Sequence, residues 1–588
     1  MRDERKLSID FLMGAAAIGA ALVGKPLEGV ILIFLFSLSN TLEAFAMGRT
    51  REAIHKLMDL RPTEATLVDA NGNETGHLAV DSLQPGHRIL VRPGERIAAD
   101  GQVSSGQSEV DQSAITGESV PVPKRPGADV YAGTINVGGA LVVRVTKEAG
   151  ETMLAKIVRL VEEAREQRAP AQHFIDRFAH PYTIGVVIVT ALVGVVPVLA
   201  FGVAWGDAFY RAMTLLVVAS PCALVISTPS AILSGIANGA RNGVLFKGGA
   251  YLDLAGGIDT IAFDKTGTLT VGRPRVQEIV TTDEMVEERQ GEDSTWRAGA
   301  SFDPTVRLLA MAAAVEKNSE HHLGRAVLEE AETRGVTVPE VEEFAAFPGE
   351  GVVGRVEGES AWVGNAAMAA RMNIRIDVML RGWIAEQTSL GRSVVYVGNS
   401  SDVVGAISFG DALKHTAAAT VRHLKYEGIR WIAILSGDHP DAIRAVAAQL
   451  GVDEVRAGLL PHEKVDAVRV LAESSGGVAM VGDGVNDAPA MAAATLGIAM
   501  GAVGTDVAIE TADVVLMSDD VEKVDYVIHL GKRARRVVRQ NVYFSIGWMF
   551  FLVVVALTVG IPLTFAVVAH EGSTLLVAAN GLRMLAGR

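Results

Sequence analysis

The chain has a single cysteine, Cys222, among its 588 residues. One thiol excludes internal disulfides and any metal-delivery module built on a Cys-x-x-Cys pair. Cys222 is therefore either a core residue or a ligand. Basic residues are also in deficit, with 53 Lys and Arg against 68 Asp and Glu and a formal net charge of −15. Because a phosphate-binding surface needs a basic face, this balance argues against nucleic acid as a partner.

Hydrophobic residues make up 49% of the chain although 21% of it is charged. With a mean hydropathy of +0.29, the apolar residues must be concentrated in blocks, as in a membrane protein with large soluble parts. Six stretches approach the roughly 20 apolar residues that cross a bilayer. They form three pairs: Ile9 to Val23, Leu27 to Met47, Tyr182 to Phe201, Met213 to Leu233, Val542 to Gly560 and Ile561 to Leu582.

The first stretch is followed too closely by another span to be a cleaved signal peptide, and we interpret it as a retained helix. Basic residues flank the same ends of all three pairs, as in Arg49-Thr50-Arg51 and Lys532-Arg533. The opposite loops carry little charge, with Lys25 and Arg211 as exceptions. The positive-inside rule then places every large segment in the cytosol.

Patterns between the spans divide the soluble part. Short alternating strands bounded by Gly, Pro, Asn and Asp indicate a compact β-domain over 51–150, and an amphipathic helix follows over 151–181. From 241 the chain alternates strands with helices, which predicts a doubly wound parallel sheet with its site at the carboxyl ends of the strands. The pattern changes over 276–404 and then returns, which indicates an inserted domain.

The run Asp264-Lys265-Thr266-Gly267-Thr268 follows a short apolar strand. A carboxylate accepts a phosphoryl group only where positive charge offsets the repulsion between two anions. Lys265, turn N–H groups and a Mg²⁺ ion are the expected sources of that charge. An isolated Asp-Lys pair would indicate only a solvated turn at the end of a strand. A chance match over all five residues is a much weaker explanation than a phosphate-accepting site.

Two further motifs accompany this run, Thr116-Gly117-Glu118-Ser119 and Gly482-Asp483-Gly484-Val485-Asn486-Asp487-Ala488-Pro489. In that chain order the three motifs resemble the P-type ATPases, the ion pumps that pass through an aspartyl-phosphate. The resemblance runs from about Asp10 to Arg583.

The resemblance implies a multi-domain membrane protein. It combines a helical transmembrane bundle with a cytosolic β actuator domain, an α/β haloacid-dehalogenase-like phosphorylation domain and an inserted α+β nucleotide-binding domain. The expected segments are transmembrane pairs at 1–50, 182–240 and 538–588, the actuator domain at 51–150, a linker helix at 151–181, the phosphorylation domain at 241–275 and 405–537, and the nucleotide-binding domain at 276–404.

Carboxylates around a glycine turn predict the magnesium site. Asp483 and Asp487 flank Gly484 and Asn486 after a strand, and hard oxygen ligands beside phosphate favour Mg²⁺. A dinucleotide turn is the alternative, but no third glycine or later ribose-binding acid fits it. The resemblance implies that Asp483, Asp264 and the backbone carbonyl of Thr266 hold Mg²⁺, with Asn486 and Asp487 nearby.

The resemblance also assigns residues to phosphate and nucleotide. It implies that phosphoryl oxygens are held by Lys464 and by the segment Ser436-Gly437-Asp438, where Ser436 stands in place of the more usual Thr. Glu118, in the loop with Thr116 and Gly117, is expected to orient the water that hydrolyses the aspartyl-phosphate.

In the inserted domain, Glu316-Lys317-Asn318-Ser319-Glu320-His321-His322 resembles the Ser-Glu-His-Pro motif of heavy-metal pumps, with His322 in place of the Pro. The resemblance places Glu316 and His321 at the adenine. Gly349 and Gly351 are expected to allow close approach of the backbone to ATP. An adjacent His pair that binds adventitious metal is the alternative.

Two polar clusters fall at the centre of predicted spans. Pro221 in Ser220-Pro221-Cys222 lacks an N–H, so we expect the helix to break there. The carbonyl of Val217 should then lose its hydrogen-bond partner. Pro229 is expected to remove the partner of the Val225 carbonyl in the same way. Unwound backbone at membrane depth is tolerated where it lines a site. A packing kink is the bland alternative.

The last span carries His570-Glu571-Gly572-Ser573-Thr574 at its midpoint, and a carboxylate there costs on the order of 3 kcal/mol. On a helix His570, Glu571 and Thr574 share one side. Together with Ser220 and Cys222 they predict one site for a transported cation. Thiolate, imidazole and carboxylate suit Co²⁺ or Zn²⁺, whereas Cu⁺ would want more sulfur.

The Ser-Pro-Cys and His-Glu-Gly-Ser-Thr motifs together resemble the cobalt subgroup of the heavy-metal P-type ATPases. The resemblance implies an ATP-driven exporter of Co²⁺, and also of Zn²⁺, that uses ATP and Mg²⁺ and works as a monomer in the bacterial inner membrane with its catalytic domains in the cytosol. Export of Zn²⁺ and Cd²⁺, or of Fe²⁺ and Ni²⁺, is the alternative. More distant alternatives are a membrane-tethered haloacid-dehalogenase-like phosphatase and a metal sensor without turnover. Such pumps commonly have two more helices before the first pair, so we expect a six-helix form or a shortened start.

Overall fold

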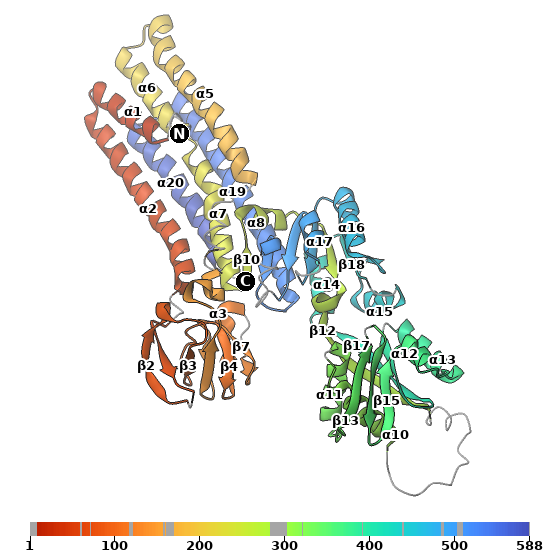
Figure 1. The fold of residues 1–588 in the computed structure, drawn as a ribbon. Helices are drawn as coiled ribbons and strands as arrows, with labels where there is room; N and C mark the ends of the chain where they lie inside the picture. The colour runs from red at the N-terminus through yellow and green to blue at the C-terminus, as the bar shows by residue number, and fades with distance from the viewer. Residues whose placement is uncertain are drawn as a thin grey trace. The chain divides into compact units, whose positions relative to one another are not determined.

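The structure of the protein is a computed structural model that describes residues 9–58, 62–70, 72–116, 121–156, 159, 170–282, 303–319, 321–347, 349–390, 392–437, 440–483, 487–501 and 510–586. The chain forms two compact units. The first comprises Met1–Ile258 and Thr495–Arg588, and the second comprises Asp259–Ala494. Figure 1 labels the helices and strands of both.

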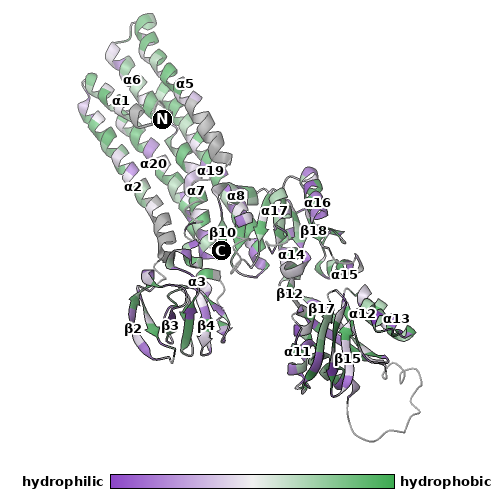
Figure 2. Ribbon diagram, viewed as in Figure 1, coloured by the Kyte–Doolittle hydropathy of each residue, from purple (hydrophilic) through white to green (hydrophobic). Residues whose placement is uncertain are grey.

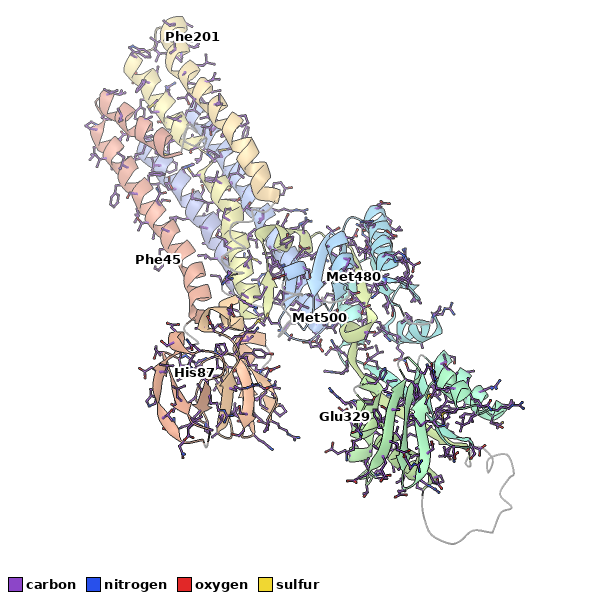
Figure 3. All side chains as sticks on the ribbon, viewed as in Figure 1. Phe45, His87, Phe201, Glu329, Met480 and Met500 are labelled. Carbon is purple, nitrogen blue, oxygen red and sulfur yellow. The ribbon has the colours of Figure 1, made fainter. Side chains whose placement is uncertain are left out.

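Long apolar helices dominate the first unit. Figure 2 shows that they are mainly hydrophobic along their length, and Phe201, labelled in Figure 3, lies at the end of one of them. They are α1 (Ile9–Leu22), α2 (Pro26–Met58), α5 (Pro170–Phe201), α6 (Trp205–Val218), α7 (Cys222–Arg241), α19 (Glu522–Thr558) and α20 (Leu563–Leu582). Their shared core includes Met13, Leu32, Val217 and Leu563, each at most 2% exposed.

Among the residues that the structure describes, three helical stretches are long and apolar enough to cross a membrane: Pro181–Phe201, Trp205–Arg241 and Glu522–Thr558. Met13–Leu22 and Pro26–Leu42 are shorter apolar helices. The helix α20 is outside this set because His570, Glu571 and Asn580 interrupt its apolar sequence. Six spans were expected from the sequence, the first of them short, and helices α1, α2, α5, α6 with α7, α19 and α20 cover them. Three of the six meet this criterion over the described residues.

The span predicted over Met213 to Leu233 is two helices. The helix α6 ends at Val218 and α7 begins at Cys222, so the break falls at Ser220-Pro221 as expected. The expectation for Val217 is wrong, because its carbonyl accepts the N–H of Ser220 at 3.2 Å in a tight turn. Pro229 does not end a helix either, since α7 continues through it to Arg241.

A β-domain follows α2 in the first unit. One sheet has the strand order β2-β1-β3-β9-β4-β7, and a smaller one has the order β6-β5-β8. Alternate residues of β9 are buried, which gives this sheet one apolar face. The strands are β1 (Glu64–Val68), β2 (Glu74–Ala79), β3 (Arg88–Val91), β4 (Gly101–Ser105), β5 (Ser108–Asp111), β6 (Val122–Lys124), β7 (Asp129–Val130), β8 (Ile135–Asn136) and β9 (Leu141–Val145), with the helical turn α3 (Ser113–Thr116) after β5.

Smaller elements complete the first unit. The strand β22 (Val514–Leu516) pairs antiparallel with β10 (Val244–Phe246) and parallel with β21 (Leu496–Ala499). The short helix α8 (Gly249–Ala255) packs against α19, where Gly256 and Gly531 approach so closely that a side chain on either would meet the backbone of the other segment. Arg535 of α19 donates to Asp253 of α8 at 3.0 Å and strengthens this contact.

The second unit contains a parallel sheet in the order β20-β11-β18-β19. Its central strands are buried on both faces, as expected for a parallel sheet covered by helices. Met480, labelled in Figure 3, lies in β20. The strands are β11 (Thr260–Asp264), β18 (Trp431–Leu435), β19 (Glu454–Arg456) and β20 (Val478–Gly482), and the helices are α14 (Ala417–Tyr426), α15 (Pro440–Leu450), α16 (Pro461–Ser474) and α17 (Ala488–Ala493).

A second, antiparallel sheet is inserted after β11, in the order β12-β17-β16-β15-β14-β13. Its core contains Leu309, Val327, Ile407 and Phe409, each at most 1% exposed. The elements are β12 (Thr270–Thr281), α10 (Pro304–Glu316), α11 (His322–Thr333), β13 (Val341–Phe347), β14 (Gly351–Val356), β15 (Glu359–Gly364), α12 (Ala366–Arg371), α13 (Val378–Ser389), β16 (Ser393–Asn399) and β17 (Val403–Leu413).

Candidate catalytic site and cation site

Asp264 is the last residue of β11, and all five residues of that strand are buried. The strand pairs in parallel with β18, so that Asp264 lies opposite Leu435 and next to the start of the loop at Ser436. The carboxyl ends of parallel strands meet at one edge of the sheet. The fold therefore brings Asp264 and Ser436 to the same edge, where we expected the catalytic site.

The turn after Asp264 depends on a glycine. Thr266 has extended backbone angles, and Gly267 takes a φ of 72°, in the left-handed region that glycine tolerates best. The Thr270 hydroxyl donates to the carbonyl of Lys265 at 3.0 Å, and the Lys414 ammonium donates to the carbonyl of Gly267 at 3.1 Å. These bonds fix the course of the turn.

Lys464 contacts Asp264, the expected nucleophile. Its Nζ atom lies 2.6 Å from Asp264 Oδ1 and 2.8 Å from Asp487 Oδ1. The side chains of Asp264 and Asp487 are 8% and 2% exposed. Lys464 lies in the first turn of α16, where the Glu463 carboxylate accepts the N–H of Leu460 at 2.8 Å and caps the helix. The cap fixes the turn from which Lys464 reaches the two carboxylates.

Burial and neighbouring charges alter the titration of this cluster. The pKa of Asp264 is raised to about 6, mainly by burial and also by the charge of Asp487, while Lys464 acts in the opposite direction. Burial also raises the pKa of Asp487. Burial alone would lower the pKa of Lys464, but the charge of Asp264 and hydrogen bonds to both carboxylates raise it above its ordinary value.

The charge balance of this cluster fits a Mg²⁺ ion. The charges of Asp483 and Asp487 both act on Asp264, and the ammonium of Lys464 bonds to Asp264 and Asp487. Carboxylates beside a loop carbonyl are the hard oxygen ligands that Mg²⁺ takes. Asp264, Asp483 and the Thr266 carbonyl are therefore suitable holders. Asp487, expected near the ion, forms an ion pair with Lys464 at 2.8 Å.

The structure describes some of the other residues that we expect to contact phosphate. Ser436 is 2% exposed and its N–H donates to the carbonyl of Arg456 at 3.0 Å. Gly437 follows it in the exposed loop after β18. Asp438, Asn486, Gly117 and Glu118 lie outside the described residues, and Thr116 is the last described residue of the turn α3.

In the inserted domain Glu316 lies at the buried end of α10. Its residue is 6% exposed, and burial raises the pKa of its carboxyl. Within the described part of the chain its Oε2 atom has no hydrogen-bond partner. His321 is exposed and caps α11, where its Nδ1 accepts the N–H of Leu323 at 3.3 Å. The two residues expected at the adenine thus differ sharply in burial.

The two glycines expected near ATP flank a turn between β13 and β14. Gly349 has a φ of 76°, which a side chain would strain. A Cβ atom at Gly351 would meet the carbonyl oxygen of Val363 on β15. Both positions therefore require glycine for backbone reasons that hold whether or not ATP is bound.

The break between α6 and α7 carries the expected membrane ligands. Ser220 Oγ and Cys222 Sγ lie 3.2 Å apart, and both residues are at most 6% exposed. On α20, His570, Glu571 and Thr574 are buried to a similar degree, and the Thr574 hydroxyl donates to the carbonyl of His570 at 3.4 Å. The predicted ligands are thus buried on the paired helices α7 and α20.

A small cavity lies between these helices and α19. It is lined by Ser220, Pro221, Ala223, Leu224, Ser545, Trp548, Met549, His570 and Ser573. Among the residues that the structure describes, His570 Nε2 and Ser545 Oγ are buried without a hydrogen-bond partner. The Ser573 hydroxyl is bonded instead to the carbonyl of His570 at 2.6 Å.

Cys222 and Glu571 do not line this cavity. A search of the described residues finds no group of three or more His, Cys, Asp and Glu side chains arranged to hold a metal. Sequence reasoning did not assign Ser573, Ser545, Trp548 or Met549. Ser573 lay within the quoted motif, whereas the α19 residues carry no motif and would have needed the helix packing to be known.

Comparison with known proteins identifies the family. Residues 59–162 match the model of the P-type ATPase actuator domain, and residues 258–495 match that of the haloacid dehalogenase-like hydrolases. The zinc-transporting ATPase of Bacillus subtilis is 42% identical over 588 residues, covering 99% of this chain and 88% of that protein. The chain belongs to the heavy-metal-transporting P-type ATPases.

Other relatives agree with this membership. A probable cadmium-transporting ATPase of Staphylococcus aureus is 40% identical and covers 98% of this chain and 77% of that protein. The crystal structure of a zinc-transporting PIB-type ATPase in the E2.Pi state is 40% identical, with a TM-score of 0.65 over 98% of this chain and 90% of that one.

Membership confirms the predicted fold class and enzyme class. The chain is a membrane-embedded P-type ATPase with cytosolic catalytic domains, of which one is haloacid-dehalogenase-like. Relatives that match nearly the whole chain are transporting ATPases, so the tethered phosphatase and the sensor without turnover are set aside. The chain is a metal-transporting ATPase.

Proposed function

We propose that this pump exports divalent transition-metal cations from the cytosol, with Zn²⁺ and Co²⁺ as its cargo. The observation that supports this choice is the burial of one thiol, one imidazole and one carboxylate, those of Cys222, His570 and Glu571, on the paired helices α7 and α20. One sulfur with nitrogen and oxygen donors suits borderline divalent ions.

The relatives and the motifs favour different members of this class. The relatives are named for zinc and cadmium, and the membrane motifs resemble the cobalt subgroup. Zn²⁺ is common to both, since that subgroup is expected to act on it as well. Cd²⁺, a softer ion, is the second candidate because of the cadmium-transporting relatives.

The geometry at Asp264 supports the phosphorylation step. An Asp264 oxygen forms a bond to the γ-phosphorus of ATP while the bond from that phosphorus to the β,γ-bridging oxygen breaks, and ADP leaves with the electron pair. Lys464, bonded to Asp264 at 2.6 Å, offsets the repulsion between the carboxylate and the phosphate. Mg²⁺, when bound, neutralises charge on the phosphoryl oxygens.

Hydrolysis completes the cycle. We assign to Glu118 the orientation of a water whose oxygen bonds to phosphorus while the acyl phosphate bond breaks, which returns Asp264 as a carboxylate and releases phosphate. Ser436 and Gly437 are proposed to hold phosphoryl oxygens at the edge of the sheet, with Asp438 beside them. Glu316, His321, Gly349 and Gly351 are proposed to bind the nucleotide, and the monomer is proposed as the working unit.

The test is the ATPase activity of the purified full chain across Zn²⁺, Co²⁺, Cd²⁺, Ni²⁺, Fe²⁺ and Cu⁺. We expect strong stimulation by Zn²⁺ and Co²⁺, weaker stimulation by Cd²⁺ and none by Cu⁺. Cys222→Ala and Glu571→Ala are expected to lose the stimulation while retaining ATP binding. Equal stimulation of the wild type and both variants would remove the proposed cation site.

A further inference from the structure

The cavity at the break between α6 and α7 is bounded on one side by α19, which contributes Ser545, Trp548 and Met549. These residues lie within one turn, so that they share a face of the helix. The Trp548 ring N–H donates to the carbonyl of Ala569 at 2.9 Å, which ties this turn to α20 directly before His570. The turn of α19 is thus fixed against the helix that carries the predicted ligands.

Two residues of this turn that line the cavity, Ser545 and Met549, carry potential donor atoms. Ser545 is 4% exposed and its Oγ is without a hydrogen-bond partner in the described part of the chain. A buried hydroxyl that makes no bond costs free energy, so its retention needs a ligand or water to compensate it. Met549 adds a thioether sulfur at the same cavity.

Tyr182 of α5 connects Met549 to the break. Its hydroxyl lies 2.8 Å from the carbonyl oxygen of Ala219 and 3.1 Å from Met549 Sδ. A phenol has one hydrogen to donate, so these two acceptors compete for it. A cation that takes the lone pair of Met549 Sδ leaves the hydrogen to Ala219, whose carbonyl precedes the break, and no buried group loses its partner.

We propose that Met549 is a further ligand of the transported cation and determines how well the pump accepts soft metals, with Ser545 as a neighbouring oxygen donor. This inference rests on the proposed function. Thioether sulfur favours soft ions. Cys222 alone provides one sulfur, and Met549 raises the number to two, which extends the range of cargo toward Cd²⁺.

The test counts sulfur neighbours of Cd²⁺ bound to the purified full chain by X-ray absorption. We expect two sulfurs in the wild type and one in Met549→Leu, a substitution of nearly equal volume. Met213→Leu is the matched control, because Met213 lies on α6 at a different, apolar cavity and does not border the cation site. The control should keep two sulfurs.

Activity gives a second measure. Met549→Leu should raise the Cd²⁺ concentration for half-maximal ATPase about tenfold, which is one decade of affinity, and that for Co²⁺ by about threefold or less. Ser545→Ala should weaken both ions alike. Equal sulfur counts in the wild type and Met549→Leu would overturn the proposal.

A final variant tests the role of Met549 even if Met549→Leu does not fold. It also distinguishes that role from the proposed export function. Cys222→Ser should retain one sulfur neighbour if Met549 binds the metal, and none if it does not. If divalent ions stimulate the ATPase activity of the wild type but its bound Cd²⁺ has one sulfur neighbour, the role of Met549 is overturned and the proposed function is not. A wild type that no divalent ion stimulates overturns the proposed function, and the role of Met549 with it.

Discussion

At the scale of single residues, burial decides when Asp264 is able to act. Its carboxyl lies at the end of a fully buried strand with Asp487 and Asp483 acting on it, and its pKa is raised to about 6. The charged form is the nucleophile, so a raised pKa keeps the group neutral in mildly acidic solution. The same shift lowers the stability of the folded protein as the pH rises from the ordinary pKa of the carboxyl to about 6. In that window the unfolded chain loses the proton of Asp264 before the folded protein does.

We therefore predict that phosphoenzyme formation falls as the pH drops through about 6, by roughly tenfold for each further pH unit. Rapid acid quenching with labelled ATP measures it. In Lys464→Ala the midpoint should move to higher pH, because the group that lowers the pKa of Asp264 is gone, whatever happens to the maximal rate. A midpoint below pH 5 in the wild type would contradict this account.

Glu118 gives a second prediction at this scale. Glu118→Gln keeps the size of the side chain but cannot take a proton from water, so phosphoenzyme should form and then persist. Its decay is expected to slow by about a hundredfold, at the lower end of what a positioned base contributes. Chase experiments with unlabelled ATP measure the decay. Glu109→Gln, in β5 of the same domain, is the control and should decay at the wild-type rate.

At the scale of elements, two prolines in one apolar stretch have different outcomes. Pro221 lies at the break between α6 and α7, whereas Pro229 lies inside α7. Alanine at Pro221 restores an N–H and permits helical geometry at Ser220, so the helix should become continuous. The backbone of Ser220 and Ala219 would then leave its present position beside the cavity.

We predict that Pro221→Ala loses metal-stimulated ATPase by at least about tenfold, equivalent to one decade of metal affinity, in a protein that remains folded. Pro229→Ala should retain activity and unfold at higher temperature, because a proline costs a helix interior about 3 kcal/mol. Thermal unfolding and Zn²⁺-dependent ATPase of the two variants test the pair. Similar loss of activity in both would show that the break at Ser220 is not what matters.

The same elements show what sequence reasoning reaches. Motifs indicated Asp264 and the Ser220 to Cys222 break from local chemistry, such as a carboxylate after a strand or a missing N–H, whereas Lys464 was implied only by the family resemblance. The ion pair from Lys464 to Asp487 joins α16 to the residue that precedes α17 and depends on how these two helices pack. In the sequence, Met549 is one apolar residue among many in its span. Its place at the cavity depends on how the helices pack.

At the scale of the whole molecule, the sequence divides the chemistry between two compact units. Asp264, the proposed nucleophile, and Lys464 belong to residues 259–494, whereas the proposed and buried membrane ligands belong to the other unit. The expected alternation of strands and helices predicted the parallel sheet in residues 259–494. The apolar runs predicted the long helices of the other unit. The first two expected spans, Ile9 to Val23 and Leu27 to Met47, correspond to α1 and to part of α2.

The last prediction concerns the orientation of the chain in the membrane. The turn between α5 and α6 and the loop between β1 and β2 lie at opposite sides if the basic flanks face the cytosol. In a Cys222→Ala background, which lacks every native thiol, Ala204→Cys and Asn73→Cys each provide one exposed reactive site. A membrane-impermeant maleimide added to intact cells should label Ala204→Cys and leave Asn73→Cys unlabelled. After permeabilisation both should react, and labelling of Asn73→Cys in intact cells would reverse the assigned topology.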